Sequence, residues 1–374
     1  MPVTIGVLRE TVRGENRVAV VPEVATRLAV QGARILVERG AGSAARFPDA
    51  SYKDAAFADR EAVLAEAEIL LAVQPPEPAL PARLKPGTVV VGFLAPHAQA
   101  ALVRALKERR ITSFAMELVP RISRAQSMDA LSSQAAVAGY KAVLLGAAAL
   151  DKFYPMLTTA AGTIRPATVL VIGAGVAGLQ AIATAKRLGA VVEAYDVRSA
   201  TREQVKSLGA KFVETGVTAE GAGGYARELT AEEKAKQQEV LDRRIAAADC
   251  VITTAGVPGR PAPRTISRAA VERMKAGAVI VDLLAEGGGN CELTRAGETV
   301  EHGDVRIIGP VNLPATVAHH ASEMYAKNLL NFLKPALKDG ALSIDWNDEV
   351  FASSCVTHEG TIRHEPTRKA VEAA

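Results

Sequence analysis

Three glycines near the middle of the chain have the spacing of a phosphate-binding turn. Gly173, Gly175 and Gly178 lie within Val169-Leu-Val-Ile-Gly-Ala-Gly-Val-Ala-Gly-Leu-Gln180, after an apolar run and before a helical stretch. The next apolar run ends on Asp196. The first glycine permits a sharp turn, the second lets the backbone approach a pyrophosphate, and the third lets the helix pack closely. This order of strand, turn, helix, strand and acid predicts a dinucleotide-binding unit.

The acid at the end of the second strand bears on the choice of nucleotide. Asp196 is placed to accept hydrogen bonds from an adenosine ribose with unmodified hydroxyls, and it would repel a 2′-phosphate. Arg198 complicates this, because an arginine near that position can accommodate the phosphate. We expect NAD(H) rather than NADP(H).

A glycine-rich loop follows this unit. Residues 214–227 include Gly216, Gly221, Gly223 and Gly224, and then Tyr225. A long loop in a compact domain is often a functional lid, because binding residues are frequently carried on loops. A solvated surface loop is the alternative, and Tyr225 would then be an exposed side chain.

The composition excludes several classes of protein. The 374 residues exceed what one hydrophobic core usually serves, so we expect two domains. A content of 49% apolar and 23% charged residues is typical of a globular protein. The net charge of +3, from both signs, gives no basis for nucleic-acid binding. The longest apolar stretch, 135–150, contains Gly139 and Lys141 and is too short to span a bilayer.

The cysteines and histidines do not indicate a metal site. Cys250, Cys291 and Cys355 lie far apart and lack ligand spacing, which predicts a reducing compartment without disulfides. His319 and His320 would point to different faces of a helix, and no set of the six histidines suits a metal ion. We expect no metal.

Apolar runs and helical stretches alternate along most of the chain. Such alternation predicts an α/β fold with parallel sheets covered on both faces. Long helices are expected at about 128–152 and 317–338, one before and one after the nucleotide-binding unit. We therefore expect two Rossmann-like doubly wound domains linked by long helices, with the nucleotide in the cleft between domains. The predicted boundaries are 1–127 plus 327–374 for the first domain and 128–326 for the nucleotide-binding domain.

A further segment identifies a family. Arg121-Ile-Ser-Arg-Ala-Gln-Ser-Met-Asp-Ala-Leu-Ser-Ser-Gln134, together with Arg17 in Glu15-Asn-Arg-Val-Ala-Val-Val-Pro22, resembles the alanine dehydrogenase/transhydrogenase superfamily. Within it, the chain is similar to the NAD(H)-binding component of proton-translocating NAD(P) transhydrogenases, the α subunit in its split form. Other matching segments are 116–121, 287–290, 325–333 and 356–364, so the resemblance covers essentially the whole chain.

Residues typical of the alanine dehydrogenases are absent. Their lysine corresponds to Gln74 here, their histidine to Ala95, and their aspartate to Glu286. An amino-acid dehydrogenase needs a general base and a cation for the substrate carboxylate. His97, two residues after Ala95, is a candidate replacement base and leaves that alternative open.

The resemblance also implies roles for individual residues. Arg121, Asp129 and Ser132 would orient the nicotinamide and its ribose, and Gln126 would reach toward the incoming NADP(H). Without the resemblance, Arg121 and Asp129 could equally form a structural ion pair at a helix start. The nucleotide pocket would comprise Gly173, Gly175, Val176, Asp196, Val197, Arg198, Gly224, Tyr225, Gln237 and Gly256.

The resemblance implies a transhydrogenase that is active only with partner subunits. NADH would give its hydride to NADP⁺ on a β subunit, and a membrane-spanning subunit would couple this transfer to proton movement. The chain would be a peripheral homodimer on the cytoplasmic face of the membrane. Two alternatives remain, an alanine dehydrogenase and a non-catalytic subunit that senses NAD(H).

Overall fold

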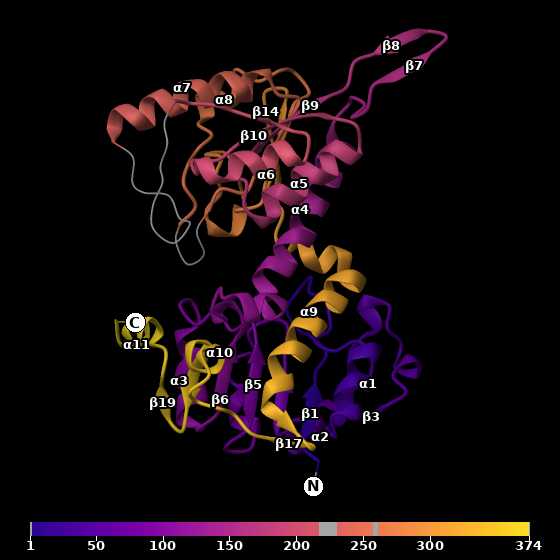
Figure 1. Cartoon of the computed structure of the whole chain (residues 1–374), viewed down its shortest axis with the longest axis vertical. Coiled ribbons are helices and arrows are strands. Elements are labelled where there is room, and N and C mark those ends of the chain that lie inside the picture. The colour runs from indigo at the N-terminus through magenta and orange to yellow at the C-terminus, as the bar shows by residue number, and fades with distance from the viewer. Residues whose placement is uncertain (1, 217–229, 257–260, 374) are drawn as a thin grey trace. The chain divides into compact units, whose positions relative to one another are not determined.

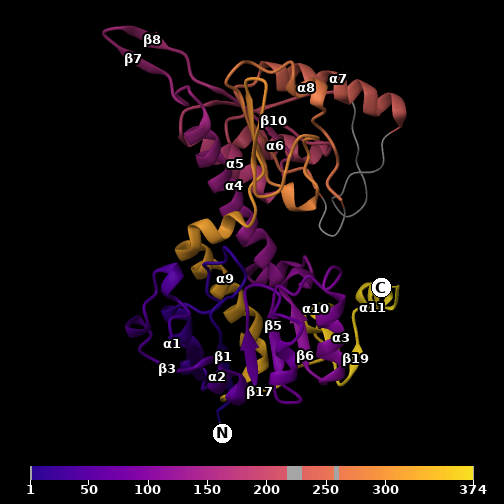
Figure 2. The same ribbon diagram turned by 180° about the vertical axis from the view of Figure 1, so that it is seen from behind.

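The computed structural model describes residues 2–216, 230–256 and 261–373 and shows two compact units. The first unit comprises Met1–Gln134 and Pro314–Ala374, and the second comprises Ala135–Leu313. Figures 1 and 2 show the chain from two sides. The sequence boundaries at 127/128 and 326/327, like those between the units, lie in or beside two long helices, α4 (Ala130–Ala149) and α9 (Ala318–Leu333).

The first unit contains an eight-stranded sheet in the order β19-β18-β6-β5-β4-β1-β2-β3. Strands β1 to β6 are parallel, and β18 and β19 are antiparallel additions from the C-terminal segment. The strands are β1 (Thr4–Val7), β2 (Arg34–Glu38), β3 (Ala55–Ala58), β4 (Ile69–Leu71), β5 (Val89–Gly92), β6 (Thr112–Ala115), β18 (Cys355–His358) and β19 (Thr361–Ile362). The helices are α1 (Pro22–Val30), α2 (Arg60–Glu66), α3 (Ala100–Glu108), α9, α10 (Glu349–Ser354) and α11 (Glu365–Ala373), with a short hairpin of β16 (Leu337–Lys338) and β17 (Ala341–Leu342).

Helix α9 packs one apolar face into the core of the first unit. Ala321, Tyr325, Leu329 and Phe332 are at most 1% exposed, as their helical spacing predicts. Met324, which is also apolar, is 37% exposed. The 3.6-residue repeat of the helix places position 324 at the edge of the buried stripe, where solvent reaches it.

The second unit contains, over its described residues, a seven-stranded sheet in the order β11-β10-β9-β12-β13-β15-β14. All its neighbouring pairs are parallel except β14 with β15. The strands are β9 (Thr168–Ile172), β10 (Val191–Tyr195), β11 (Lys211–Phe212), β12 (Cys250–Thr253), β13 (Val279–Asp282), β14 (Thr299–His302) and β15 (Val305–Ile308). The helices are α5 (Val176–Arg187), α6 (Arg202–Ser207), α7 (Ala231–Ala247) and α8 (Arg268–Val271).

Both sheets confirm the predicted doubly wound fold. In each, the first strand lies centrally and the strand order reverses beside it, between β1 and β4 and between β9 and β12. Ligands of such sheets bind outside the carboxyl ends of the strands at this reversal. A ligand of either sheet would therefore contact the segments that follow these four strands.

A hairpin of β7 (Leu157–Thr159) and β8 (Gly162–Ile164), which was not predicted from the sequence, extends away from the rest of the second unit (Figures 1 and 2). Its strands are short and every residue in them is exposed, so they lack the buried alternation that identifies a strand. Phe153, Met156 and Ile164 in and before it are 53%, 64% and 49% exposed.

No helix in the described ranges is both long and apolar enough to cross a membrane. Within the same ranges, no three His, Cys, Asp or Glu side chains gather into a group that could hold a metal ion.

A buried hydroxyl contributes to holding the C-terminal addition on the first sheet. Thr357 Oγ1 donates to Ile111 O at 2.8 Å and lies 2.7 Å from Ser113 Oγ. We expect Thr357→Val to lower the free energy of unfolding by about 1–3 kcal/mol, because buried polar groups would lose their partner. Urea unfolding measures this. Thr361→Val, which alters an exposed hydroxyl, is the control, and equal losses in the two variants would contradict the prediction.

Candidate nucleotide-binding site

The turn after β9 requires its first glycine. Gly173 has φ +95°, a left-handed conformation that favours glycine. A Cβ atom there would lie 2.7 Å from Thr254 Oγ1 and 2.9 Å from Ala255 N. The turn therefore packs directly against the segment that follows β12.

The other two glycines of the motif differ in what surrounds them. A Cβ atom on Gly178 would lie 1.8 Å from Gly173 O, so α5 contacts the turn at a distance that only glycine allows. A Cβ atom on Gly175 would meet no protein atom within 4 Å. Gly175 caps the N-terminus of α5, where backbone N–H groups point outward and favour an anion. This open space at a helix N-terminus suits a diphosphate, and Val176 beside it is 44% exposed.

Asp196 follows β10 and its carboxylate already accepts four hydrogen bonds. Arg198 donates to Oδ1 from its backbone N and Nε, at 2.8 and 2.9 Å, and to Oδ2 from Nη2 at 2.9 Å. Ala174 N donates to Oδ2 at 2.7 Å, which ties the glycine turn to β10. Asp196 is 9% exposed, and neighbouring Val197 packs against apolar residues of the core. A ribose hydroxyl could reach this carboxylate only by replacing bonds from Arg198.

The remaining predicted pocket residues come from α7 and from the segment after β12. Gln237 Oε1 on α7 is buried and lacks a hydrogen-bond partner among the described residues. This oxygen could accept a hydrogen bond from a ligand. Gly256 packs against Leu284, whose Cδ1 atom would be 2.8 Å from a Cβ. Gly224 and Tyr225 lie outside the described residues.

The segment that carries Arg121, Gln126, Asp129 and Ser132 belongs to the first unit, whereas the glycine turn belongs to the second. Asp129 accepts from Ser132 N at 2.8 Å and from Ser132 Oγ at 2.6 Å, so it caps the start of α4. Arg121 and Gln126 are exposed. Among the described residues, no ion pair joins Arg121 to Asp129, so the alternative interpretation of these two residues is not supported.

The first unit holds a buried polar cluster that was not foreseen from the sequence. Arg17 donates from Nε and Nη2 to the two oxygens of Glu15, at 2.8 and 2.6 Å, and from Nη1 to Gln134 Oε1 at 2.8 Å. Gln74 Nε2 donates to Glu15 Oε2 at 2.8 Å. Arg17 is 4% exposed, so its guanidinium is committed to protein oxygens. The signal was present in the sequence as Glu15 two residues before Arg17, but its bidentate geometry was not predictable.

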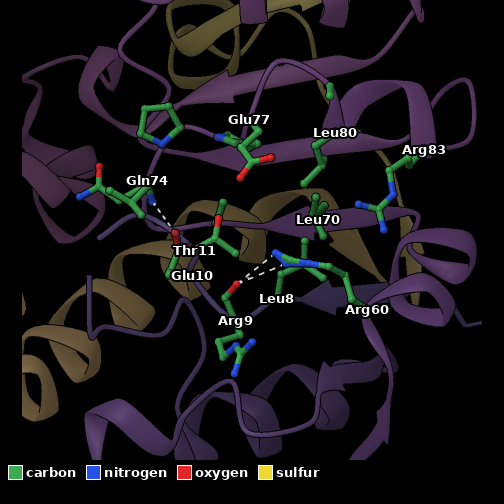
Figure 3. Close-up of a pocket in the computed structure, with 15 residues that line it drawn as sticks. Leu8, Arg9, Glu10, Thr11, Arg60, Leu70, Gln74, Glu77, Leu80 and Arg83 are labelled. Carbon is green, nitrogen blue, oxygen red and sulfur yellow. Dashed lines mark hydrogen bonds between the residues drawn. The ribbon is translucent and has the colours of Figure 1, made fainter. Parts of the chain in front are cut away.

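A neighbouring cavity of about 120 Å³ lies at the carboxyl ends of β1 and β4, and Figure 3 shows the residues that line it. Glu10 lines it and accepts hydrogen bonds from Val73 N at 2.6 Å and Gln74 N at 3.3 Å. Arg60 donates across the cavity rim to Arg9 O. Burial raises the pKa of Glu10 to about 7, and the nearby charge of Glu15 adds to this.

Both units of the chain match domains of one protein family. Residues 6–138 match the family described as alanine dehydrogenase/PNT, N-terminal domain, and residues 142–365 match its C-terminal domain. The chain is 48% identical to a chain of NAD(P) transhydrogenase subunit alpha of Rhodospirillum rubrum, over 96% of this chain and 97% of that protein. It is 29% identical to alanine dehydrogenase of Mycobacterium tuberculosis, over 96% and 95%. The structure of transhydrogenase from Sinorhizobium meliloti superposes with a TM-score of 0.88 at 43% identity, over 96% of this chain and 99% of that one.

The raised pKa of Glu10 predicts a pH-dependent stability. A folded carboxyl with a raised pKa binds more protons than the unfolded chain, so its stabilising contribution is present below about pH 4.5 and is lost as the pH rises through about 7. In Glu10→Gln we expect the loss of unfolding free energy between pH 5 and pH 8 to shrink by about 1–3 kcal/mol. Urea unfolding at the two pH values measures it.

The control is Glu77→Gln, an exposed side chain lining the same cavity, which should not change this pH dependence. An unchanged pH dependence in Glu10→Gln would show that Glu10 is not the titrating group.

Proposed function

Because the chain belongs to the alanine dehydrogenase/PNT family, we propose that it is the NAD(H)-binding component of a proton-translocating NAD(P) transhydrogenase. Its role is to hold NAD(H) for hydride exchange with NADP(H) on a partner subunit. The observation that carries the proposal is the 48% identity to a transhydrogenase subunit over nearly the whole length of both chains. The open helix N-terminus at Gly175 supports nucleotide binding independently.

The residues of the second unit suit a dinucleotide. The N–H groups at the start of α5 would bind the diphosphate, and Asp196 the adenosine ribose. Arg198 would have to give up part of its contact with Asp196, and Gln237 Oε1 offers a further acceptor. The bound nicotinamide supplies the hydride chemistry, so the protein needs to contribute orientation and the exclusion of water.

In the first unit, we assign Arg121, Asp129 and Ser132 to orienting the nicotinamide and Gln126 to the approach of NADP(H). These roles follow from the family resemblance. The exposure of Arg121 and Gln126 supports them, because both side chains are accessible to a ligand or a partner. Asp129 also caps α4, so its two roles would be linked through Ser132.

The proposed assembly contains further chains. We propose a homodimer that docks on the cytoplasmic face of the membrane, with a membrane-spanning subunit and an NADP(H)-binding β subunit. Proton translocation would occur in the partners. The name of the Rhodospirillum rubrum relative, which designates it as one portion of a subunit alpha, supports such a multi-chain complex.

The arrangement around Arg17 disfavours an alanine dehydrogenase. A substrate carboxylate would have to displace Glu15, whose two oxygens already bind the guanidinium. The lysine position is Gln74, whose amide also binds Glu15 and brings no charge. A buried ion pair of this kind is costly to break, because one uncompensated charge would remain.

Two substitutions in the glycine turn separate nucleotide binding from folding. Gly175→Ala should leave the free energy of unfolding within about 1 kcal/mol, since φ is −78° and the Cβ enters open space. The same Cβ would obstruct a diphosphate, so we expect the Kd for NADH to rise at least about tenfold. NADH fluorescence titration and urea unfolding measure the two effects.

Gly178→Ala is the matched comparison, because its Cβ would clash with Gly173 O. It should lower the unfolding free energy by about 1–3 kcal/mol as well as weaken binding. Wild-type affinity for NADH in Gly175→Ala would argue against the proposed position of the diphosphate.

Hydride exchange itself can be followed by mixing the chain with a purified NADP(H)-binding subunit, NADPH and an NAD⁺ analogue of shifted absorbance. We expect transfer in the mixture. Gln126→Ala should slow it at least about tenfold, with the Kd for NADH changed less than about threefold, because Gln126 is assigned to the second nucleotide. Asp129→Asn should also slow transfer. Gln204→Ala, an exposed glutamine on α6, is the control.

The alternatives give other results in the same assays. NADH formation from NAD⁺ and L-alanine by the chain alone would indicate an alanine dehydrogenase. Tight NADH binding without transfer to any NADP(H)-binding subunit would indicate a sensing subunit.

A further inference from the structure

One buried amide joins the segments that follow β12 and β13 in the second unit. Asn290 is 0% exposed, and its Nδ2 donates to Ala255 O at 2.7 Å and to Pro263 O at 2.8 Å. Its Oδ1 accepts from Thr253 Oγ1 at 2.6 Å. An Asn side chain has two donors and an acceptor with two lone pairs, so three of its four possible bonds are made inside the protein. Asn290 thus holds the end of β12 and the turn after it.

Asn290 is itself fixed by a buried carboxylate at the end of β13. Asp282 Oδ2 accepts from Asn290 N at 2.7 Å, Cys291 N at 3.0 Å and Thr294 Oγ1 at 2.7 Å. Its Oδ1 accepts from Leu284 N at 3.0 Å. These bonds compensate the cost of burying the group and hold the Asn290 backbone in one position. The amide therefore acts from a fixed support.

The turn that Asn290 holds carries Gly256, a predicted pocket residue. Thr254 Oγ1 donates to Gly173 O at 3.0 Å, which joins the same turn to the glycine motif. Leu284 packs against Gly256 so closely that a Cβ would lie 2.8 Å away. The position of Gly256 is thus set by three contacts, of which the Asn290–Ala255 bond is nearest to it in the chain.

The strand order assigns this turn to one half of the ligand. A dinucleotide lies across the reversal point of a doubly wound sheet, and Asp196 after β10 marks the adenosine side. Strand β12 lies on the other side of β9. The segment after β12 therefore faces the nicotinamide half. Resting on the proposed function, we propose that Asn290 is a positioning residue that fixes the turn after β12 and thereby sets the affinity for the nicotinamide half of NAD(H), without affecting the adenosine half.

The test compares two ligands in the full-length chain. In Asn290→Asp, a carboxylate oxygen replaces Nδ2 and faces the carbonyl oxygens of Ala255 and Pro263, so both bonds are lost. Isothermal titration calorimetry should show the Kd for NADH rising at least about tenfold, while the Kd for 5′-AMP changes less than about twofold. A merely structural residue would weaken both ligands equally.

A second variant covers the case in which Asn290→Asp does not fold. Thr253→Val removes only the donor to Asn290 Oδ1 in a side chain of nearly the same shape, and it should raise the Kd for NADH at least about twofold with 5′-AMP unchanged. The control is Asp249→Asn. Asp249 accepts from Thr168 N and Lys152 at the amino ends of the strands, so this change should affect stability but not the ratio of the two Kd values.

The possible failures are distinguishable. If the folded variants keep the wild-type ratio of Kd values for NADH and 5′-AMP, the role of Asn290 is wrong and the proposed function stands. If the wild-type chain does not bind NADH, the proposed function is wrong and this inference falls with it.

Discussion

The second unit depends on how closely α5 approaches the turn after β9. Gly173 O occupies the space where a side chain at Gly178 would begin, so the helix starts in direct contact with the turn. In the same turn, Gly173 O accepts a hydrogen bond from Thr254 Oγ1, and Ala174 N donates one to Asp196 Oδ2. The ends of β9, β10 and β12 are thus held together by hydrogen bonds to the backbone of this turn. These contacts leave the N-terminus of α5 open beside Gly175.

The two sheets share a central strand order, but the groups that follow their strands have different surroundings. In the first unit, the polar side chains that follow the strands bind one another, as Arg17, Glu15 and Gln74 do. In the second unit, the N-terminus of α5 has open space at Gly175, and Gln237 Oε1 on α7 has no hydrogen-bond partner among the described residues. Polar groups that saturate one another have little to offer a ligand. The open space at the N-terminus of α5, rather than the fold alone, supports nucleotide binding in the second unit.

Local patterns predicted the sheets, most long helices and the glycine turn, because strand periodicity and turn chemistry are encoded within a few residues. The exposed hairpin of β7 and β8 was not predictable, since it does not follow from apolar spacing. Asn290 was not singled out, because its partners Thr253 and Ala255 lie 37 and 35 residues away. Likewise, the motif identified Asp196, but only the structure shows Arg198 lying on it.

The guanidinium of Arg17, which is buried and bound by Glu15, also constrains how this chain could change during evolution. Replacing Glu15 alone would leave a buried cation without its counterion, a loss of roughly 3–5 kcal/mol in a typical protein. Introducing a lysine at Gln74 alone would add a second cation beside a carboxylate that is already shared. A route to metabolite turnover would therefore need several coordinated replacements, and an intermediate that loses Glu15 alone would be less stable than its ancestor.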